Sequence, residues 1–197
     1  IPALSISLFL SANEEDVKQA MLAGYPAGQV HESRHIDEED DQELRVAFDF
    51  DGVVADDESE TIYQETHDVA KFHEYEQSHV NVPHTPGPLK DFLAKLSIVQ
   101  QLEEKKATED AQYKPKLRIS IVTARNAPSH ERVINTMRNW GITVNEAFFL
   151  GGIEKKKVLE VLNPHIFFDD QKTHLVPTSS VLPSVHIPFG ITNTTSP

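Results

Sequence analysis

The stretch LRVAFDFDG, residues 44–52, decides the fold of this chain. The run Leu44–Phe50 is rich in apolar and aromatic residues, and this pattern predicts a buried strand that ends at Asp49 and Asp51. Gly52 follows at once and permits a tight turn, because glycine adopts backbone angles that other residues avoid. The sequence therefore predicts two carboxylates at the end of a buried strand.

Four similar apolar runs follow, separated by stretches with helical spacing. The runs are Leu117–Val122, Ala147–Leu150, Ile166–Phe168 and Val185–Ile187. One helix is expected after Pro128 and ends near Gly141, and another is expected over Lys155–Leu162. Short apolar strands that alternate with helices indicate an α/β fold, a Rossmann-like parallel sheet with helices on both faces. Such sheets bind ligands at the carboxyl ends of their strands.

Two regions depart from this alternation. Before the sheet, an apolar run ends at Leu10, and Ser11-Ala12-Asn13-Glu14 predicts a capping box and a helix that Gly24 ends. Residues 31–43, HESRHIDEEDDQE, are acidic and nearly devoid of apolar side chains, as expected for a solvated linker. The sequence thus predicts an N-terminal strand and helix with a linker over residues 1–43 and an α/β domain over residues 44–197. Within that domain, residues 57–115 are interpreted as a small helical insertion.

Charge and composition exclude several classes of protein. The chain has 197 residues, with 18 Lys and Arg against 31 Asp and Glu, and its net charge of −13 argues against binding to a nucleic acid polymer or an anionic membrane. No apolar run reaches the roughly 18 residues that span a bilayer, so a soluble, cytoplasmic protein is expected. The chain has no cysteine, which excludes a disulfide, a thiolate zinc site and a cysteine nucleophile.

Acidic pairs at two strand ends predict a metal site. Asp49 and Asp51 are separated by one residue, so they lie on the same side of an extended chain. Asp169 and Asp170 close another predicted strand, and a parallel sheet would bring the two pairs together. Four carboxylates in one place need a cation, and oxygen ligands suit a hard ion such as Mg²⁺. The alternative for each pair is an ordinary solvated turn in an acidic chain.

Residues suited to hold a phosphate follow other predicted strands. Thr123 ends a strand, and its hydroxyl, with the backbone N–H groups from Ala124 onward, makes a suitable phosphate cradle. Arg125 is interpreted either as a second phosphate contact or as a cation that flanks the next helix. Lys155 could neutralise both a phosphate and a carboxylate, and the alternative for it is a solvated helix start.

The order of these motifs, a strand with DxD, a strand with Thr, a lysine and a strand with DD, resembles the haloacid dehalogenase superfamily of phosphotransferases. The resemblance implies that Asp49 is the nucleophile that becomes an aspartyl-phosphate and that Asp51 is the general acid and then the base. Thr123 would bind the phosphoryl group, and Lys155 would stabilise the charged intermediate. The implied substrate-binding residues are Gly52, Thr123, Ala124, Arg125 and Lys155. The implied magnesium ligands are Asp49, the main-chain carbonyl of Asp51, Asp169 and Asp170.

Longer stretches are similar to the cytosolic 5′-nucleotidase I family. They include LRVAFDFDGVVADDESE, IVTARNAPSHERVINTMRNWGI and PHIFFDDQ, and the resemblance covers roughly residues 8–190. It implies a magnesium-dependent enzyme that hydrolyses nucleoside 5′-monophosphates, with AMP a leading substrate. Those relatives have a long region before the segment that matches LFLSANEED, so a chain that begins at Ile1 is interpreted as a truncated or cleaved piece of a longer protein. Homo-oligomer formation is left open.

The same resemblance makes the insertion a cap over the active site, which would exclude water and contact the nucleoside. Phe72, Tyr75 and His79 are candidates to border the base, although aromatic side chains at helical spacing more often pack in a core. Two other functions stay open on the sequence alone. The chain could hydrolyse another small phosphate ester, because the cap defines the substrate, or it could be a catalytically silent nucleotide-binding domain.

Overall fold

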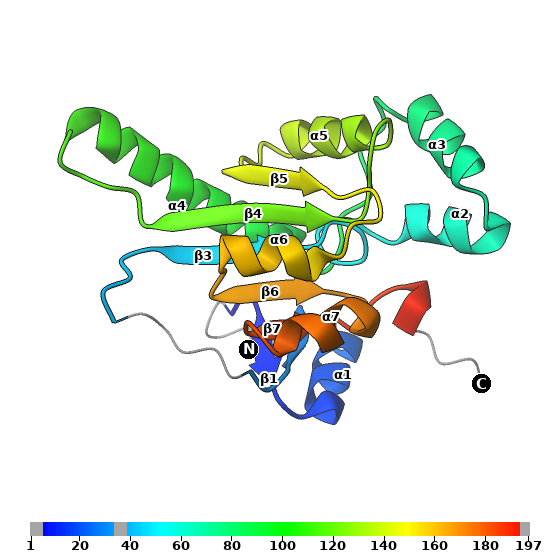
Figure 1. Ribbon diagram of the computed structural model, residues 1–197, viewed down its shortest axis with the longest axis horizontal. Helices are drawn as coiled ribbons and strands as arrows, with labels where there is room; N and C mark the ends of the chain where they lie inside the picture. The colour runs from blue at the N-terminus through cyan, green and yellow to red at the C-terminus, as the bar shows by residue number, and fades with distance from the viewer. Residues whose placement is uncertain (1–5, 34–38, 194–197) are drawn as a thin grey trace.

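The computed structural model describes residues 6–33 and 39–193, which form a seven-stranded sheet with helices on both faces (Figure 1). The strands are β1 (Phe9–Ser11), β2 (Ala27–Val30), β3 (Leu44–Phe48), β4 (Leu117–Thr123), β5 (Glu146–Phe149), β6 (Ile166–Asp169) and β7 (Ser184–His186). The helices are α1 (Glu14–Leu22), α2 (Glu58–Thr66), α3 (Val69–Ser78), α4 (Lys90–Glu109), α5 (His130–Asn139), α6 (Lys155–Leu162) and α7 (Lys172–Ser179), and a 3-10 turn over Ile191–Asn193 follows.

The strand order is β1-β2-β7-β6-β3-β4-β5, and every pair of neighbours is parallel except β2 with β7. The carboxyl ends of β3, β4, β5 and β6 therefore lie at the same edge of the sheet. The predicted α/β fold with a Rossmann-like sheet is confirmed. The antiparallel pairing of β2 with β7 is a difference from the wholly parallel sheet that the sequence indicated.

Alternating side chains of the strands fill two cores, one on each face of the sheet. In β3, Val46 and Phe48 belong to the core that α4 and α5 cover, while Ala47 belongs to the core that α6 and α7 cover. In β6, Phe168 lies in the first core and Phe167 in the second. This period of two is the geometry of strands that are buried on both faces. Figure 1 shows α6 and α7 in front of the sheet and α4 behind it.

The helical region that the sequence analysis treated as one insertion has two parts. Helices α2 and α3, which we call the cap, stand beyond the carboxyl ends of the strands (Figure 1). Helix α4 instead packs against the sheet, with Leu93 fully buried in the core. Pro86 forms an antiparallel bridge with Ala55, so the chain leaves and re-enters the sheet layer at neighbouring points. Only α2 and α3 of the predicted insertion are therefore placed to cover a site at the strand ends.

The N-terminal segment contributes two strands to the same sheet. β1 pairs with β2, and β2 lies along β7, so the sheet continues across the predicted boundary at residue 43. Gly28 allows this close packing, because a Cβ at that position would lie 2.4 Å from Cγ1 of Val185. The centre of the predicted linker, residues 34–38, lies outside the described residues. The end of the linker is tied to β3, because Arg45 and Asp41 form an ion pair at 2.6 Å.

Helix α1 is capped by a different residue from the one that the sequence indicated. Ser11 is the last residue of β1, and Asn13 caps the helix by accepting a hydrogen bond from the N–H of Glu15 at 2.9 Å. The predicted capping box at Ser11 is therefore wrong, because that residue still belongs to the strand. The helix ends just before Gly24, whose φ of +79° confirms the predicted helix stop.

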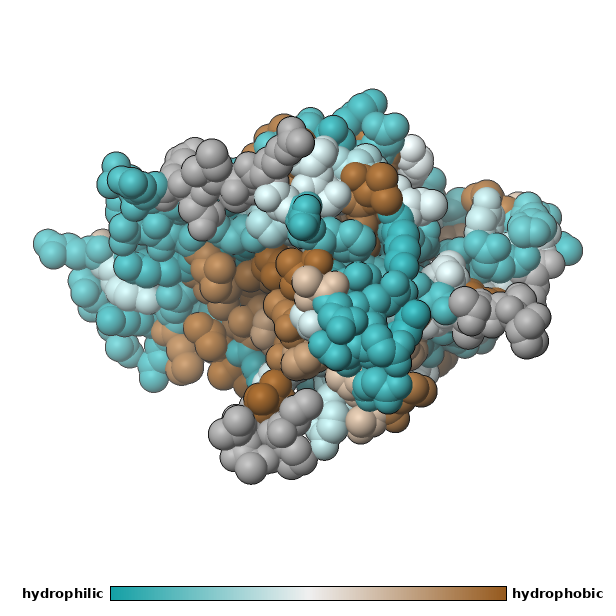
Figure 2. All heavy atoms as spheres, turned by 90° about the horizontal axis from the view of Figure 1, so that it is seen from below, coloured by the Kyte–Doolittle hydropathy of each residue, from teal (hydrophilic) through white to brown (hydrophobic). Residues whose placement is uncertain are grey.

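The face seen in Figure 2 is largely hydrophilic, in keeping with the excess of acidic residues. This view from below also shows an apolar area near the centre, between hydrophilic areas. Among residues 6–33 and 39–193, none of the helices combines the length and the hydropathy needed to span a bilayer.

Candidate active site

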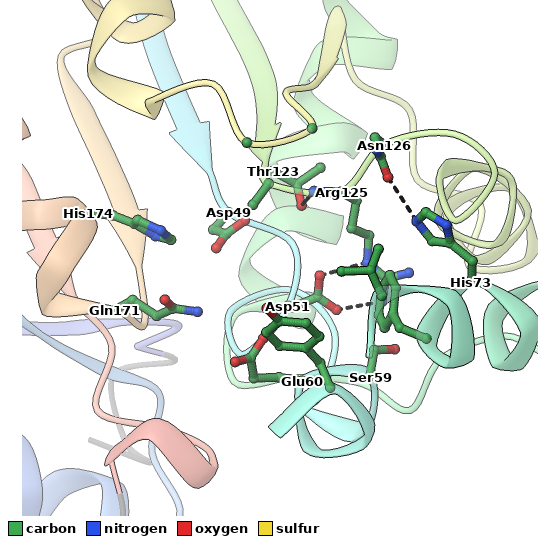
Figure 3. Close-up of a pocket in the computed structure, with 16 residues that line it drawn as sticks. Asp49, Asp51, Ser59, Glu60, His73, Thr123, Arg125, Asn126, Gln171 and His174 are labelled. Carbon is green, nitrogen blue, oxygen red and sulfur yellow. Dashed lines mark hydrogen bonds and ion pairs between the residues drawn. The ribbon is translucent and has the colours of Figure 1, made fainter. Parts of the chain in front are cut away.

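A pocket of about 370 Å³ lies where the carboxyl ends of the central strands meet the cap. Its floor consists of residues that follow the strands, and its outer wall belongs to α2 and α3 (Figure 3). The floor residues are Asp49, Asp51, Thr123, Ala124, Arg125, Asn126, Gly151, Gly152, Gln171 and His174. The wall residues are Ser59, Glu60, Tyr63, Val69, Phe72 and His73.

Lys155 joins two of the acidic strand ends. Its Nζ lies 2.5 Å from Oδ2 of Asp49 and 2.7 Å from Oδ2 of Asp169, and all three side chains are buried. Lys155 is the first residue of α6, which places its side chain between the ends of β3 and β6. The parallel sheet thus brings Asp49 and Asp169 together, as the sequence pattern predicts, and Lys155 pairs with both of them.

Burial and charge set the protonation of this cluster. Burial raises the pKa of Asp49 to about 6, and the charge of Asp169 adds to this effect while the Lys155 ammonium opposes it. Burial alone would raise the pKa of Asp169 too, but Lys155 and His174 outweigh burial and hold that pKa below its ordinary value. Burial would lower the pKa of Lys155, but the two carboxylates raise it, so the ammonium stays charged. At neutral pH, Asp49 is therefore mostly ionised, which is the form in which a carboxylate can act as a nucleophile.

His174 is a site residue that the sequence analysis missed. Its Nδ1 lies 3.1 Å from Oδ2 and 3.2 Å from Oδ1 of Asp169, and the ring lines the pocket. Ligand atoms of Asp49, Asp169 and His174 all lie within 4.8 Å of one another, which is close enough to share a metal ion. The sequence feature that could have identified His174 is its position in the first turn of the helix that follows Asp169 and Asp170.

Asp170 lies behind the turn at Gly52 rather than among the residues that line the pocket. Gly52 has a φ of +70°, and a Cβ there would lie 2.6 Å from Cγ of Asp170, so the turn and the carboxylate fit together only with glycine. Oδ2 of Asp170 accepts a hydrogen bond from Thr192 at 3.0 Å, whereas buried Oδ1 receives none from the residues that the structure describes.

The donor set fits a divalent cation. Burial, with the charges of Asp49 and Asp169, raises the pKa of Asp170 to about 9. Lys155 forms ion pairs with Asp49 and Asp169, whereas Asp170 forms none with the described residues and its buried Oδ1 has no donor among them. A cation with a preference for oxygen ligands would offset this excess of negative charge.

The carboxylate of Asp51 is bound by Arg125 through both of its oxygens. Nε of Arg125 donates to Oδ2 and Nη2 donates to Oδ1, each at 2.7 Å (Figure 3). The guanidinium is buried, and its Nη1 donates to Glu76 on α3. Burial alone would lower the pKa of Arg125, but Asp51 and Glu76 raise it. Arg125 thus lies in the pocket floor between two protein carboxylates, a pairing that neither interpretation of the sequence anticipated.

Glu76 connects the cap to the sheet layer and was also missed by the sequence analysis. Its Oε1 accepts hydrogen bonds from Arg132 at 3.0 Å and from Ser59 at 2.8 Å. Its Oε2 accepts from Arg125 and lies 3.6 Å from Nε2 of His84. Burial alone would raise the pKa of Glu76, but His84 and Arg125 hold it well below its ordinary value. Charged residues on a helix normally indicate a solvated face, which is why the pattern hid this buried role.

The outer wall of the pocket is aromatic. Phe72 and Tyr63 line it, with His73 beside them. Of the three aromatic candidates from the sequence, Phe72 borders the pocket. Tyr75 and His79 stack on each other, with ring centroids 4.2 Å apart, and are not among the lining residues.

The predicted phosphate-binding residues occupy three kinds of position. Thr123, Ala124 and Arg125 line the pocket at the end of β4. Lys155 is buried next to the carboxylate of Asp49 in the floor. Gly52 forms the turn above Asp170. All of them gather at one edge of the sheet.

Comparison with known proteins relates the chain to 5'-nucleotidases. The family model described as 5'-nucleotidase matches residues 1–194. The human protein Cytosolic 5'-nucleotidase 1B is 36% identical over 176 residues, which cover 89% of this chain and 28% of that protein. The chain therefore spans less than a third of the length of this curated relative. No solved structure matches the chain.

Proposed function

The chain belongs to the 5′-nucleotidase family, and from this premise we propose that it hydrolyses nucleoside 5′-monophosphates, with AMP a leading substrate, to a nucleoside and phosphate. The observation that carries the proposal is the buried Asp49, paired with Lys155, in the floor of a pocket with an aromatic wall. A carboxylate nucleophile suits phosphate transfer, and an aromatic wall suits a nucleobase. We place the protein in the cytoplasm, like the relative named above.

In the proposed binding mode, the phosphate enters the floor and the nucleoside contacts the wall. Thr123 and the backbone beyond it face the phosphate, because they end β4 beside Asp49 in the floor of the pocket. Phe72 and Tyr63 offer ring surfaces to the base. His73 forms a hydrogen bond of 3.0 Å with Asn126, so this polar pair can exchange partners with polar atoms of the nucleoside.

Two displacement steps complete the proposed reaction. Asp49 attacks phosphorus, the bond from phosphorus to O5′ breaks, and Asp51 gives a proton to O5′, so that the nucleoside leaves. Asp51 then takes a proton from water, whose oxygen attacks phosphorus, and the bond to Asp49 breaks to release inorganic phosphate. Lys155 offsets negative charge on Asp49 and on the transferring group.

The proposed cofactor is Mg²⁺, held by Asp49, Asp169, Asp170 and the main-chain carbonyl of Asp51. When bound, such an ion offsets the charge of the phosphoryl oxygens. His174 and the N–H of Gln171 both contact Asp169, and these contacts would fix the orientation of this carboxylate as a ligand.

Phosphate release from a panel of esters tests this function. The panel contains nucleoside 5′-monophosphates and simple sugar phosphates, each with Mg²⁺ or with a chelator. Magnesium-dependent release that favours nucleotides, and that disappears in Asp49→Asn, supports the proposal. Faster release from sugar phosphates would make the chain a phosphatase of another small ester. Binding of AMP with no release over hours would make it a silent nucleotide-binding domain.

A further inference from the structure

A buried series of ion pairs joins Asp51 to the cap through Arg125. Arg125 binds both oxygens of Asp51 at 2.7 Å, and its remaining terminal nitrogen donates to Glu76 on α3. A guanidinium that donates to both oxygens of a carboxylate occupies one acceptor position on each oxygen, and so competes there with a leaving group or a water molecule. The position of Arg125 therefore decides how far Asp51 is available for proton transfer.

Glu76 is the fixed end of this series, and Asp51 is the more accessible end. The side chain of Glu76 is 0% exposed, whereas that of Asp51 is 21% exposed. Arg132 and Ser59 hold Oε1 of Glu76, and His84 lies beside Oε2. Glu76 thus presents an anchored negative charge that competes with Asp51 for the guanidinium of Arg125.

Helix α3 also touches Arg125 through a second side chain. The guanidinium carbon of Arg125 lies 5.5 Å from the ring centroid of Phe72, within the range of a cation–π contact. Phe72 and Glu76 are four residues apart on α3, so they share one face of the helix. The same face that lines the proposed nucleoside site therefore carries the charge that competes for Arg125.

We propose that Glu76 is a positioning residue, which draws Arg125 toward the cap and so limits its hold on the general acid Asp51. This inference rests on the proposed function, because it assigns proton transfer to Asp51. Without the charge of Glu76, the guanidinium has Asp51 as its remaining carboxylate partner and binds it more strongly. Proton delivery to the leaving oxygen then becomes slower, while the attack by Asp49 is unaffected.

Esters that differ in their need for a proton provide the test. The substrates are p-nitrophenyl, phenyl and benzyl phosphate, which present single rings of similar size, together with AMP. p-Nitrophenolate leaves as a stable anion, whereas benzyl alcohol and a nucleoside need a proton. The measured quantity is kcat/KM with Mg²⁺, because it reports steps up to the departure of the leaving group. The proteins are the unaltered chain, Glu76→Gln, Glu76→Asp, Asp51→Asn and Glu58→Gln.

Asp51→Asn is the reference variant, because it removes the proton donor itself. Its kcat/KM should fall about 10²- to 10⁴-fold on benzyl phosphate and much less on p-nitrophenyl phosphate. For Glu76→Gln we expect the ratio of kcat/KM for p-nitrophenyl to benzyl phosphate to rise at least about tenfold. Glu58 binds Arg132 at 3.1 Å in the same network but does not contact Arg125, so Glu58→Gln should leave this ratio unchanged. Retained p-nitrophenyl phosphate turnover shows that a variant is folded.

The outcomes separate this inference from the proposed function. If the ratio of kcat/KM for p-nitrophenyl to benzyl phosphate is unchanged in Glu76→Gln, because all esters lose activity equally or none does, the inference is overturned. If Glu76→Gln does not fold, the ratio is measured for Glu76→Asp, which keeps the charge but shortens the reach to Arg125. Loss of all turnover in both variants would show a structural role and also overturn it. Failure of the unaltered chain to hydrolyse AMP, with turnover of the aryl esters, would contradict the proposed function alone.

Discussion

Replacement of Lys155 by methionine should destabilise the fold far more than the same change at the next residue. Lys155 is buried between Asp49 and Asp169, with Nζ to Oδ2 distances of 2.5 and 2.7 Å. Methionine keeps most of the side-chain volume but removes the charge, so two buried carboxylates lose their common partner. Removal of one partner from a buried ion pair costs about 3–5 kcal/mol, a large part of the 5–15 kcal/mol that typically stabilises a domain.

Urea unfolding followed by circular dichroism, with a chelator present, measures this cost. Lys156→Met is the matched control, because Lys156 is on the same helix, is 32% exposed and forms a long ion pair of 3.7 Å with Glu160. Its expected cost is below about 1 kcal/mol. Addition of Asp169→Asn to Lys155→Met should restore part of the stability, because one unpaired carboxylate is removed. A cost below about 1 kcal/mol for Lys155→Met, or no recovery in the double variant, would refute the reasoning.

Three further predictions concern the turn, the cap and the core. Gly52→Ala should lower the melting temperature more than Gly24→Ala. Both glycines have a positive φ, which costs about 1–2 kcal/mol for alanine. Only at Gly52 would the added Cβ also clash with Asp170. Because the folded pKa of Glu76 lies below its ordinary 4.5, its contribution to stability should be full above about pH 4.5 and lost as the pH falls. The difference in unfolding free energy between the unaltered chain and Glu76→Gln should therefore shrink in acid, and a constant difference from pH 7 to 3 would contradict this. Leu93→Ala should cost about 2–5 kcal/mol in urea unfolding, and Leu102→Ala, on the exposed side of the same helix, less than about 0.5 kcal/mol.

The sheet was predictable where strands are buried on both faces. The run that contains Val46 and Phe48 is almost continuously apolar, and such a run leaves little choice but a central strand. β2 was not predictable in this way, because its four residues, AGQV, include a glycine and a glutamine. Its strand conformation depends on pairing with β1 and with β7, which is distant in sequence. Local patterns do not contain such tertiary information.

The residues of the candidate site also fall into those that the sequence predicts and those that it does not. Asp49, Thr123 and Asp169 are recognisable because each stands at or directly after the carboxyl end of an apolar strand. Glu76 and Arg125 were not assigned their partners, because an ion pair between residues 49 positions apart leaves no periodic signal. His174 was missed because a single histidine near a helix start is common. The sequence patterns thus locate the residues fixed by the sheet, whereas the contacts of the cap require the folded structure.

The pairing of β2 with β7 has a consequence for the association of chains. β7 lies between β6 and β2, and its side chain Val185 packs closely over Gly28 of β2. A chain that started at Leu44 would leave one row of N–H and C=O groups of β7 without partners, next to the apolar Val185 and Ile187. An unprotected strand of this kind recruits strands from other molecules. The segment before the linker therefore shields the central sheet from edge-to-edge aggregation.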